Sequence, residues 1–473
     1  MEGISRRDLL KYAAYGSIFV GSGLLTSRVA AGENTSFSFA DTGQERPMAI
    51  CLSDFHIGER YGGITDDPGH PDKYLQLDDA DSDSPFVRKE FMEFLRYCKS
   101  MKDKHGKIKY LIVLGDMWDL AMNNQESSFT LSSVFFRQLQ ELNKGLGIGD
   151  LFENVIYVPG NHDHHFWKML QERYWITQRL EQGRSPLEMP RVAGLTIDAT
   201  TGAVQHAQTP TGENRIPLHN LVSPLLGVDS NTPVYVAYPH IFLRKPNKEY
   251  TLLTHGHFFE PDWNMVTIMF GDLMQKNGIP LTIRNIEMFN SITTEMHSHA
   301  LGQTPPYEFW DKIYDQQYTD KAPPEWQKGA RKILEAHFYL RDEDIVGQSQ
   351  TQSAKYHDIQ ALQNQRGLVE HYLAQAEKEG LESGQRVTSL IYGHTHVPSF
   401  GGTFMRYQDQ EKSPLDIHNT GGWVNINPDT FHMPQPTLID KNGEVQQLCC
   451  VSERVTSNKL WPMAKTGTPG SRG

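Results

Sequence analysis

Five short apolar segments of the chain each end in glycine, aspartate, asparagine or histidine. Continuous apolar runs of about four to eight residues are typical of strands that are buried on both faces. We therefore predict five buried strands with polar residues at their carboxyl ends. The segments are MAICLSD (48–54), IKYLIVLGD (108–116), NVIYVPGNHD (154–163), YTLLTHGH (250–257) and VTSLIYGHTH (387–396).

Helical patterns separate the first three of these segments. Apolar residues recur at helical spacing in SPFVRKEFMEFLRYCKSM (84–101) and in SSVFFRQLQELNKGLG (132–147), which ends at a glycine. Alternation of strand and helix predicts an α/β fold with functional loops at the carboxyl ends of the strands. After residue 414 the pattern changes to short strands separated by turn signals such as Asn442-Gly443.

Two longer segments interrupt this plan. Residues from about 183 to 231 are rich in Pro, Gly, Thr and Asn and have weak periodicity, which predicts loops or a small subdomain. Residues from about 258 to 385 have mainly helical patterns, and we predict that they form a cap over or beside the strand ends. The predicted organisation is a linker at 32–47, one domain at 48–450 that contains both insertions, and a C-terminal tail at 451–473.

Charge and cysteine usage exclude some classes of function. The chain has 473 residues and a formal net charge of −12. This acidic balance opposes binding to a polyanion, so we expect no nucleic-acid partner. Four cysteines, of which Cys449 and Cys450 are adjacent, do not have the spacing of a disulfide framework. We expect Cys51 and Cys98 to be packing residues.

The N-terminus resembles a twin-arginine export signal. SRRDLLK (5–11) precedes a mildly apolar segment at 12–25, small residues follow up to Ala31, and Leu9 stands where Phe is commonest. Fourteen helical residues would span about 21 Å, which is less than the roughly 30 Å of a bilayer's hydrocarbon core. We therefore expect a signal peptide at 1–31 and no stable transmembrane segment. The expected location is periplasmic or extracellular, after export by the twin-arginine translocation machinery.

The polar strand ends carry the residue types of a metal site. Residues i and i+2 of an extended chain point to the same side, so Asp54 can converge with His56, and His394 with His396. Carboxylate, imidazole and amide oxygen suit borderline or hard divalent ions, and the absence of thiolates argues against structural zinc. One polar strand end alone is more often an ordinary turn, but five polar strand ends after buried strands favour a shared site. They are Asp54-x-His56, Gly115-Asp116-x-x-Asp119, Gly160-Asn161-His162-Asp163, Thr254-His255-Gly256-His257 and Gly393-His394-Thr395-His396.

In this order the five motifs resemble the calcineurin-like metallophosphoesterase superfamily. G-N-H-D and G-H-x-H are the most discriminating elements, and the resemblance extends from about Met48 to Cys450, apart from the insertions. It implies a four-layer α-β-β-α sandwich, in which two mixed β-sheets pack face to face between helices. The short strands after His396 would belong to the second sheet. The resemblance also implies two divalent metal ions, with Mn, Fe and Zn as the candidates.

The resemblance further implies a role for each residue of the site. His162 would lie over the leaving group as a proton donor or charge stabiliser, and Asp163 would orient it. The reaction would be hydrolysis of a phosphomonoester or phosphodiester by in-line attack of a metal-bridging hydroxide. The resemblance implies that Asp54, His56 and His396 bind one ion. Asn161, His255 and His394 would bind the other. Asp116 would bridge the two ions.

Several positions stay open at this point. His255 and His257 compete for one ligand place, and we favour His255 because it directly follows the apolar strand. His164 and His165 extend the G-N-H-D motif. Either could contact a phosphate oxygen, although a surface position at a helix start is commoner. The two histidines of EMHSH (295–299) diverge by about 200° on a helix, so we do not expect them to share an ion.

The motifs do not specify the substrate. Our first expectation is an exported phosphatase or phosphodiesterase that acts on a small-molecule or lipid-linked phosphoester. One alternative is a pyrophosphatase acting on a nucleotide-linked or lipid-linked substrate, which SDFHIG (53–58) and GDMWDL (115–120) resemble. A second alternative is a noncatalytic metal-binding protein on the same fold. Such a protein would tend to lack a ligand or His162, and none is missing here.

Overall fold

The structure is a computed structural model of the chain. The residues that it describes are 37–39, 46–58, 89–121, 124–142, 145–176, 181, 183, 191–206, 225–228, 231–260, 262–301, 366–396, 402–408, 411–423, 434–448 and 450–452. The predicted signal at 1–31, residues 302–365 of the predicted cap and the tail from 453 onward lie outside these ranges.

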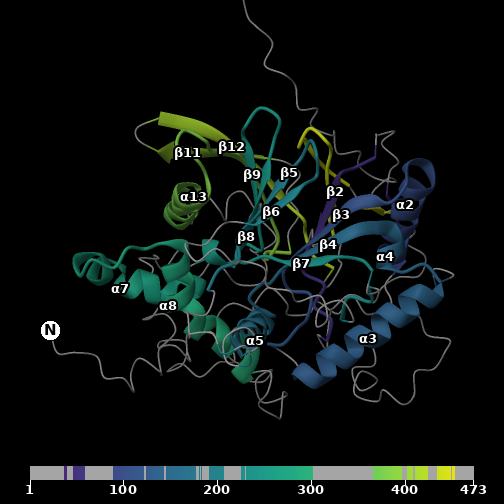
Figure 1. Cartoon of the computed structure of the whole chain (residues 1–473), viewed down its shortest axis with the longest axis horizontal. Coiled ribbons are helices and arrows are strands. Elements are labelled where there is room, and N and C mark those ends of the chain that lie inside the picture. Colours follow the sequence, from purple (N-terminus) through teal and green to yellow (C-terminus); the bar gives the residue numbers. More distant parts are fainter. Residues whose placement is uncertain are drawn as a thin grey trace, which may run out of the picture.

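Two mixed β-sheets pack against each other at the centre of the described chain, with helices around them (Figure 1). The six-stranded sheet contains, in spatial order, β14 (Val445–Gln447), β13 (Thr437–Ile439), β2 (Ala49–Leu52), β3 (Ile108–Leu114), β4 (Phe152–Val158) and β7 (Val234–Val236). The seven-stranded sheet contains β11 (Gly402–Gln408), β12 (Glu411–Asn419), β10 (Val387–Tyr392), β9 (Tyr250–Thr254), β8 (His240–Arg244), β5 (Leu195–Asp198) and β6 (Val204–His206).

The five predicted buried strands are confirmed as β2, β3, β4, β9 and β10. Strands β2, β3 and β4 are parallel neighbours in one sheet, and β9 and β10 are parallel neighbours in the other. Alternate residues of a strand face opposite sides, and here both sides are buried. In β3, Leu111 and Val113 belong to one apolar cluster, whereas Ile112 and Leu114 belong to another. The apolar run of β3 is uninterrupted because both faces of this strand are buried.

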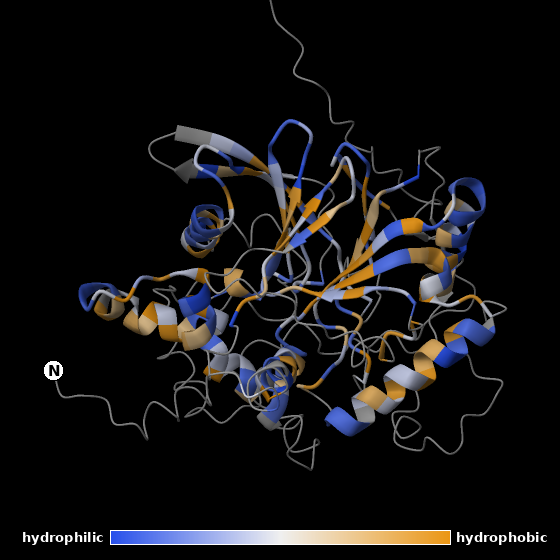
Figure 2. Cartoon of the chain, in the orientation of Figure 1, coloured by the Kyte–Doolittle hydropathy of each residue, from blue (hydrophilic) through white to orange (hydrophobic). Residues whose placement is uncertain are grey.

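One of these clusters joins the two sheets. Ile112 and Ile156 of the six-stranded sheet pack in it together with Ile241, Leu253 and Ile391 of the seven-stranded sheet. Figure 2 shows hydrophobic residues concentrated along the central strands, with hydrophilic residues toward the outer helices. The sheets therefore bury apolar faces against each other. Burial of this kind contributes roughly 25 cal/mol for each Å² of apolar surface removed from water.

Helices pack against both sheets. Helices α2 and α4 contact β3 and β4, respectively, and α13 contacts β11. Cys51 and Cys98 are buried free thiols, as predicted for packing residues. The helices are α2 (Lys89–His105), α3 (Gln125–Leu142), α4 (Ile148–Leu151), α5 (His164–Trp175), α7 (Met265–Lys276), α8 (Ile283–Glu295) and α13 (Arg366–Gly380), with the short helices η5 (His257–Phe259), η6 (Asp262–Asn264) and the π-helical η7 (Met296–Leu301).

Two regions differ from the sequence prediction. Residues 195–198 and 204–206, inside the predicted loop insertion at 183–231, form β5 and β6 and extend the seven-stranded sheet. Their mixed polar composition gave no signal because they lie at the end of the sheet. Residues Phe37–Phe39, inside the predicted linker, form β1 and pair with β15 (Cys450–Ser452). The predicted linker is thus paired with the segment at the C-terminal end of the predicted domain.

The described helices include none with both the length and the apolar character needed to cross a membrane.

Candidate metal centre

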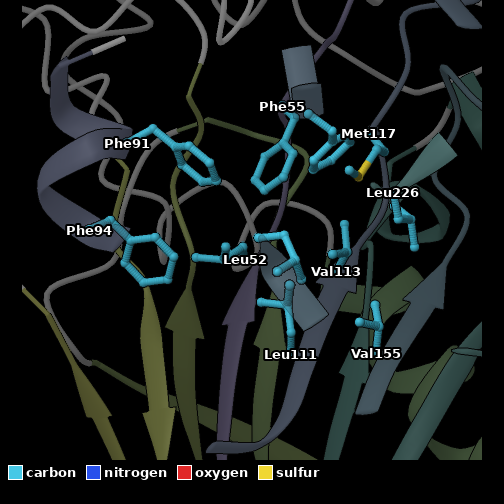
Figure 3. A pocket seen from close by; sticks show the side chains of 11 residues that line it. Leu52, Phe55, Phe91, Phe94, Leu111, Val113, Met117, Val155 and Leu226 are labelled. Atoms are coloured by element: carbon cyan, nitrogen blue, oxygen red, sulfur yellow. The ribbon is translucent and has the colours of Figure 1, made fainter. Parts of the chain in front are cut away.

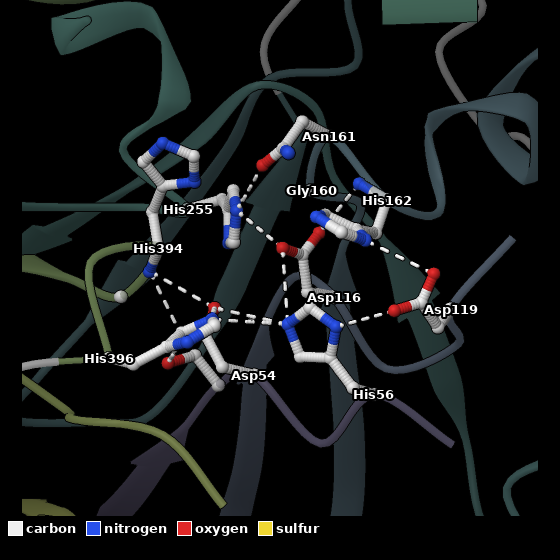
Figure 4. Close-up of polar contacts among 12 residues, drawn as sticks. Asp54, His56, Asp116, Asp119, Gly160, Asn161, His162, His255, His394 and His396 are labelled. Carbon is white, nitrogen blue, oxygen red and sulfur yellow. Dashed lines mark hydrogen bonds and ion pairs between the residues drawn. The ribbon is translucent and has the colours of Figure 1, made fainter. Parts of the chain in front are cut away.

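The predicted site residues converge where the parallel strands of both sheets end (Figure 4). Because β2, β3 and β4 run in parallel, the loops that follow them meet at one edge of their sheet, and the same holds for β9 and β10. Hydrogen bonds link the two edges directly: the backbone N–H of His394 donates to the carboxylate of Asp54, at 3.0 Å from Oδ2. Residues up to 342 positions apart therefore form one cluster.

The backbone in these loops adopts a conformation that non-glycine residues rarely take. Among the described residues, six non-glycine residues have a positive φ, and five of these six are predicted ligands. A left-handed conformation costs about 1–3 kcal/mol at such a position and persists where the surroundings enforce it. This strain is concentrated at one place in the molecule, as at many functional sites. The five predicted ligands with a positive φ are Asp54 (56°), His56 (48°), Asp116 (50°), His394 (70°) and His396 (57°).

Glycines allow the loops to approach each other. Gly115 has a φ of +85°, and a Cβ at this position would overlap the ring of His255. A Cβ at Gly160 would overlap the carboxylate of Asp116. Both positions therefore require glycine for packing reasons, and Gly115 requires it for its backbone conformation as well.

One potential metal-binding group consists of Asp54, His56 and His396. The Nε2 atoms of the two histidines lie 3.1 Å apart, and His396 Nε2 lies 3.4 Å from Asp54 Oδ1. Asp54 and His56 are fully buried, while the His396 side chain is 13% exposed. Three ligand atoms therefore point at a common position that is shielded from bulk water.

The second potential group consists of Asp116, His255 and His394. His255 Nε2 lies 3.1 Å from Asp116 Oδ2 and 2.8 Å from Asn161 Oδ1. The other ring nitrogen of His255, Nδ1, donates to the backbone carbonyl of Leu114 at 2.8 Å. This carbonyl fixes the ring so that Nε2 faces the group. Asn161, the third residue predicted with His255 and His394, thus lies beside this group.

Asp116 lies between the two groups. Its Oδ1 accepts a hydrogen bond from the backbone N–H of His162 at 2.8 Å. Its Oδ2 is buried and has no hydrogen-bond partner among the described residues, yet it lies 3.1 Å from His255 Nε2 and 3.6 Å from His56 Nε2. A buried carboxylate oxygen without a partner is costly unless a cation satisfies it. The described residues therefore fit metal ions at this place.

The charges of the site also favour a cation. Burial alone would raise the pKa of Asp116, but the positive charge of His255 holds it well below its usual range. Burial would lower the pKa of His255, but the negative charge of the nearby Asp116 carboxylate raises this pKa to about 9. Without metal, the ring of His255 is therefore protonated at neutral pH. A proton then occupies the place of the positive charge that the carboxylate attracts.

Metal binding is expected to release a proton from His255. A ligand ring must be neutral, so below about pH 9 the ion has to displace this proton, and the affinity should increase as the pH rises toward 9. Calorimetric titration at pH 7 in buffers of different ionisation enthalpy measures the release. The His255→Gln variant should release about one proton less. His240→Gln is the control, since burial lowers the pKa of His240 to about 4 and the ring is already neutral. Equal release by wild type and His255→Gln would refute this origin of the proton.

Asp119 holds two of the imidazole rings. Its Oδ2 lies 3.0 Å from His56 Nδ1 and its Oδ1 lies 3.1 Å from His162 Nδ1. Burial would raise the pKa of Asp119, but the charge of His162 and a hydrogen bond to that ring lower it. Sequence reasoning included Asp119 in the G-D-x-x-D motif but gave it no role.

Asp119 contacts the ring of His162, whereas the orienting role was predicted for Asp163. Asp163 instead accepts hydrogen bonds from the backbone N–H groups of Gly160, at 2.6 Å, and Met117, at 2.7 Å. Burial and the charge of Asp116 raise the pKa of Asp163 to about 6. Asp163 therefore fastens the loop after β4 to the loop after β3. The prediction for Asp163 rested on adjacency along the chain, which does not show contacts across it such as that of Asp119 with His162.

Glu260 is a further residue of the site that sequence reasoning missed. Its Oε2 lies 2.9 Å from His394 Nε2 and can fix the orientation of that ring. The two residues are 134 positions apart. Glu260 follows directly after η5, inside the segment predicted as a cap, where an acidic residue is unremarkable.

The open alternatives now have structural positions. His255 belongs to the second group, whereas the His257 ring stacks on Tyr238, with its Nε2 3.4 Å from the Tyr238 hydroxyl. This favours His255 as the ligand. His164 is fully buried, so its expected surface position is wrong. The ring of His299 stacks on that of His165, with centroids 3.7 Å apart.

A small apolar cavity lies apart from these charged groups, in the core between α2 and the six-stranded sheet (Figure 3). Its volume is about 10 Å³, and its lining includes Leu52, Phe55, Phe91 and Phe94. It is too small and too apolar for a charged substrate.

No known family model and no curated protein sequence matches this chain.

Proposed function

We propose that the chain is a metal-dependent phosphoesterase of the calcineurin-like metallophosphoesterase superfamily. The observation that carries the proposal is the position of Asp116 between two groups of buried ligands, with the His162 backbone bound to the same carboxylate. A metal-binding protein without a catalytic role has no need for a further imidazole beside its ligands. The order of the five sequence motifs supports the same family.

The arrangement of helices and sheets supports the finer architecture. We propose a four-layer sandwich in which α2 and α4 form one outer layer and the two sheets form the inner layers. In the predicted cap, η5 and η6 follow β9 directly and bring Glu260 and Trp263 next to His394. We propose that this segment forms one wall of the substrate site.

The proposed reaction is hydrolysis of a phosphomonoester or phosphodiester. Two divalent ions bound by these residues would activate water for attack on phosphorus and offset the charge on the phosphoryl oxygens. The carboxylate of Asp119 holds Nδ1 of His162 and stabilises the protonated ring, which leaves Nε2 to donate a proton to the leaving group. Asp119 also orients His56, so one carboxylate aligns a ligand and the proposed acid.

We propose that the protein acts after export, because the N-terminus resembles a twin-arginine signal. The substrate would be a small-molecule or lipid-linked phosphoester. A lipid-linked ester is compatible with the apolar side chains of α7, where Leu273 is 58% exposed.

A substrate panel with metal analysis tests the proposal. The purified protein is loaded with Mn²⁺, Fe²⁺ or Zn²⁺ and assayed with an aryl phosphomonoester, an aryl phosphodiester and a nucleotide pyrophosphate. We expect about two equivalents of bound metal and hydrolysis of at least one ester class. Preference for the pyrophosphate would favour the pyrophosphatase alternative. Metal binding without hydrolysis of any of these substrates would support a noncatalytic metal-binding protein instead.

A further inference from the structure

A second cluster of buried charges lies beside the candidate centre, where helix α5 begins. α5 starts at His164, directly after the G-N-H-D loop, and it contacts α8. α8 carries Glu287, whose side chain is fully buried, and Glu295, whose side chain is 26% exposed. Along the chain, both carboxylates lie more than 120 residues from His164.

His164 lies between the two carboxylates. Its Nε2 is 3.1 Å from Glu287 Oε1, and its Nδ1 is 2.5 Å from Glu295 Oε1. Both ring nitrogens therefore face acceptors, which requires a proton on each. Burial would lower the pKa of His164, but the charge of Glu287 and hydrogen bonds to both carboxylates raise it. The ring is thus held as an imidazolium between two carboxylates.

Further contacts hold the same carboxylates and the same helix start. The Tyr238 hydroxyl donates to Glu287 Oε2 at 2.9 Å, and Lys168 Nζ lies 3.3 Å from Glu287 Oε1. His165 Nδ1 lies 2.9 Å from Glu295 Oε2, and the backbone N–H of His165 donates to Ser298 Oγ at 3.0 Å. The first turn of α5 is therefore fixed by α8 and the π-helix that follows it.

The fixed start of α5 bears on His162 because His162 lies only two residues before His164, in the loop that leads into this helix. The His162 backbone is bound to Asp116 and its ring to Asp119, so a shift of the first turn of α5 would disturb both contacts. Buried ion pairs often stabilise a fold less than apolar packing would. The charged contacts of His164 are better explained by the geometry that they impose, since each carboxylate fixes one nitrogen of the His164 ring.

We propose that Glu287 and Glu295 clamp His164 and thereby position His162 for proton donation. The helical segment that carries α8 would then control the proposed general acid from outside the metal centre. Glu287, Glu295 and His164 are positioning residues in this proposal. It rests on the proposed phosphoesterase function.

Hydrogen exchange in the metal-free protein tests the clamp without reference to activity. We expect Glu287→Gln to raise the exchange rate of amides in residues 160–168 about tenfold, because a charge-assisted hydrogen bond is lost. Glu172→Gln, an exposed substitution on α5, is the control and should change nothing. Unchanged exchange in both Glu287→Gln and His164→Gln would refute the clamp, even if the protein is an active phosphoesterase.

A double-mutant cycle tests the coupling to His162. On a substrate with a poor leaving group, Glu287→Gln should lower kcat about tenfold with little change in KM, because only proton donation is impaired. In the His162→Ala background the same substitution should have almost no further effect. An equal loss in both backgrounds would show that Glu287 does not act through His162. Absence of any wild-type phosphoesterase activity would overturn the positioning role, while the exchange experiment would still decide whether the clamp exists.

Discussion

The Asp116→Asn variant is expected to lose one or both metal ions and nearly all turnover. Asn keeps the size of the side chain and one oxygen, but it removes a negative charge that belongs to the second group and lies 3.6 Å from His56 of the first. The loss of turnover should be about a thousandfold or more, since even a single donor to a developing negative charge is worth about 10²–10³. Elemental analysis of the dialysed protein and steady-state kinetics measure the two effects.

Asp103→Asn is the control for this variant. Asp103 lies on the surface of α2, where its side chain is 55% exposed and pairs with Lys99, so its loss should leave metal content and turnover unchanged. Removal of the Asp116 charge also takes away the main cause of the raised pKa of His255. If Asp116→Asn retains two equivalents of metal and full activity, the position of Asp116 between the groups has no functional meaning.

The buried strands could be predicted from sequence because their environment leaves a local signal. Ala49–Leu52 is apolar throughout since alternate residues enter different parts of the core. Leu195–Asp198 gave no such signal, because its outward residues are polar and its neighbour β8 is chosen by long-range pairing, as of Leu195 with Ile241. Three-residue strands such as β1 carry too few side chains for any period to be visible.

The candidate site could be predicted only as far as its residues follow strands. Asp54, His56 and Asp116 each interrupt an apolar run, so their positions stand out in the sequence. Contacts among side chains from different loops leave no such trace. Glu260 reaches His394 across 134 positions, and Asp119 reaches His162 across 43.

The buried position of His164 shows the same limit. A histidine at a helix start is usually exposed, and the two carboxylates that enclose it lie 123 and 131 positions away. These partners belong to a helical segment whose sequence shows only an ordinary helical period. The contacts of the candidate site thus depend on pairs between distant segments, whereas the strand pattern depends on each residue's own environment.

The His162→Ala variant is expected to keep its metal ions and to lose rate according to the leaving group. Its ring lies with His56 and Asp119 in a third potential group, outside the two groups to which we assign the ions, so in our proposal the metal content should equal that of the wild type. Removal of a positioned proton donor costs about 10²–10⁴ in rate when the leaving group needs a proton. The loss should approach this range with alkyl phosphoesters and be much smaller with nitrophenyl esters, whose leaving groups depart without protonation.

The comparison of leaving groups separates proton donation from other roles of His162. A residue that only binds phosphate, or only supports the fold, would lower the rate by a similar factor with alkyl and nitrophenyl esters. His105→Ala, an exposed substitution at the end of α2, controls for the loss of an imidazole and should leave both rates unchanged. An equal loss with both ester types would therefore exclude His162 as the general acid, and with it the reason for Asp119 to hold the ring through Nδ1.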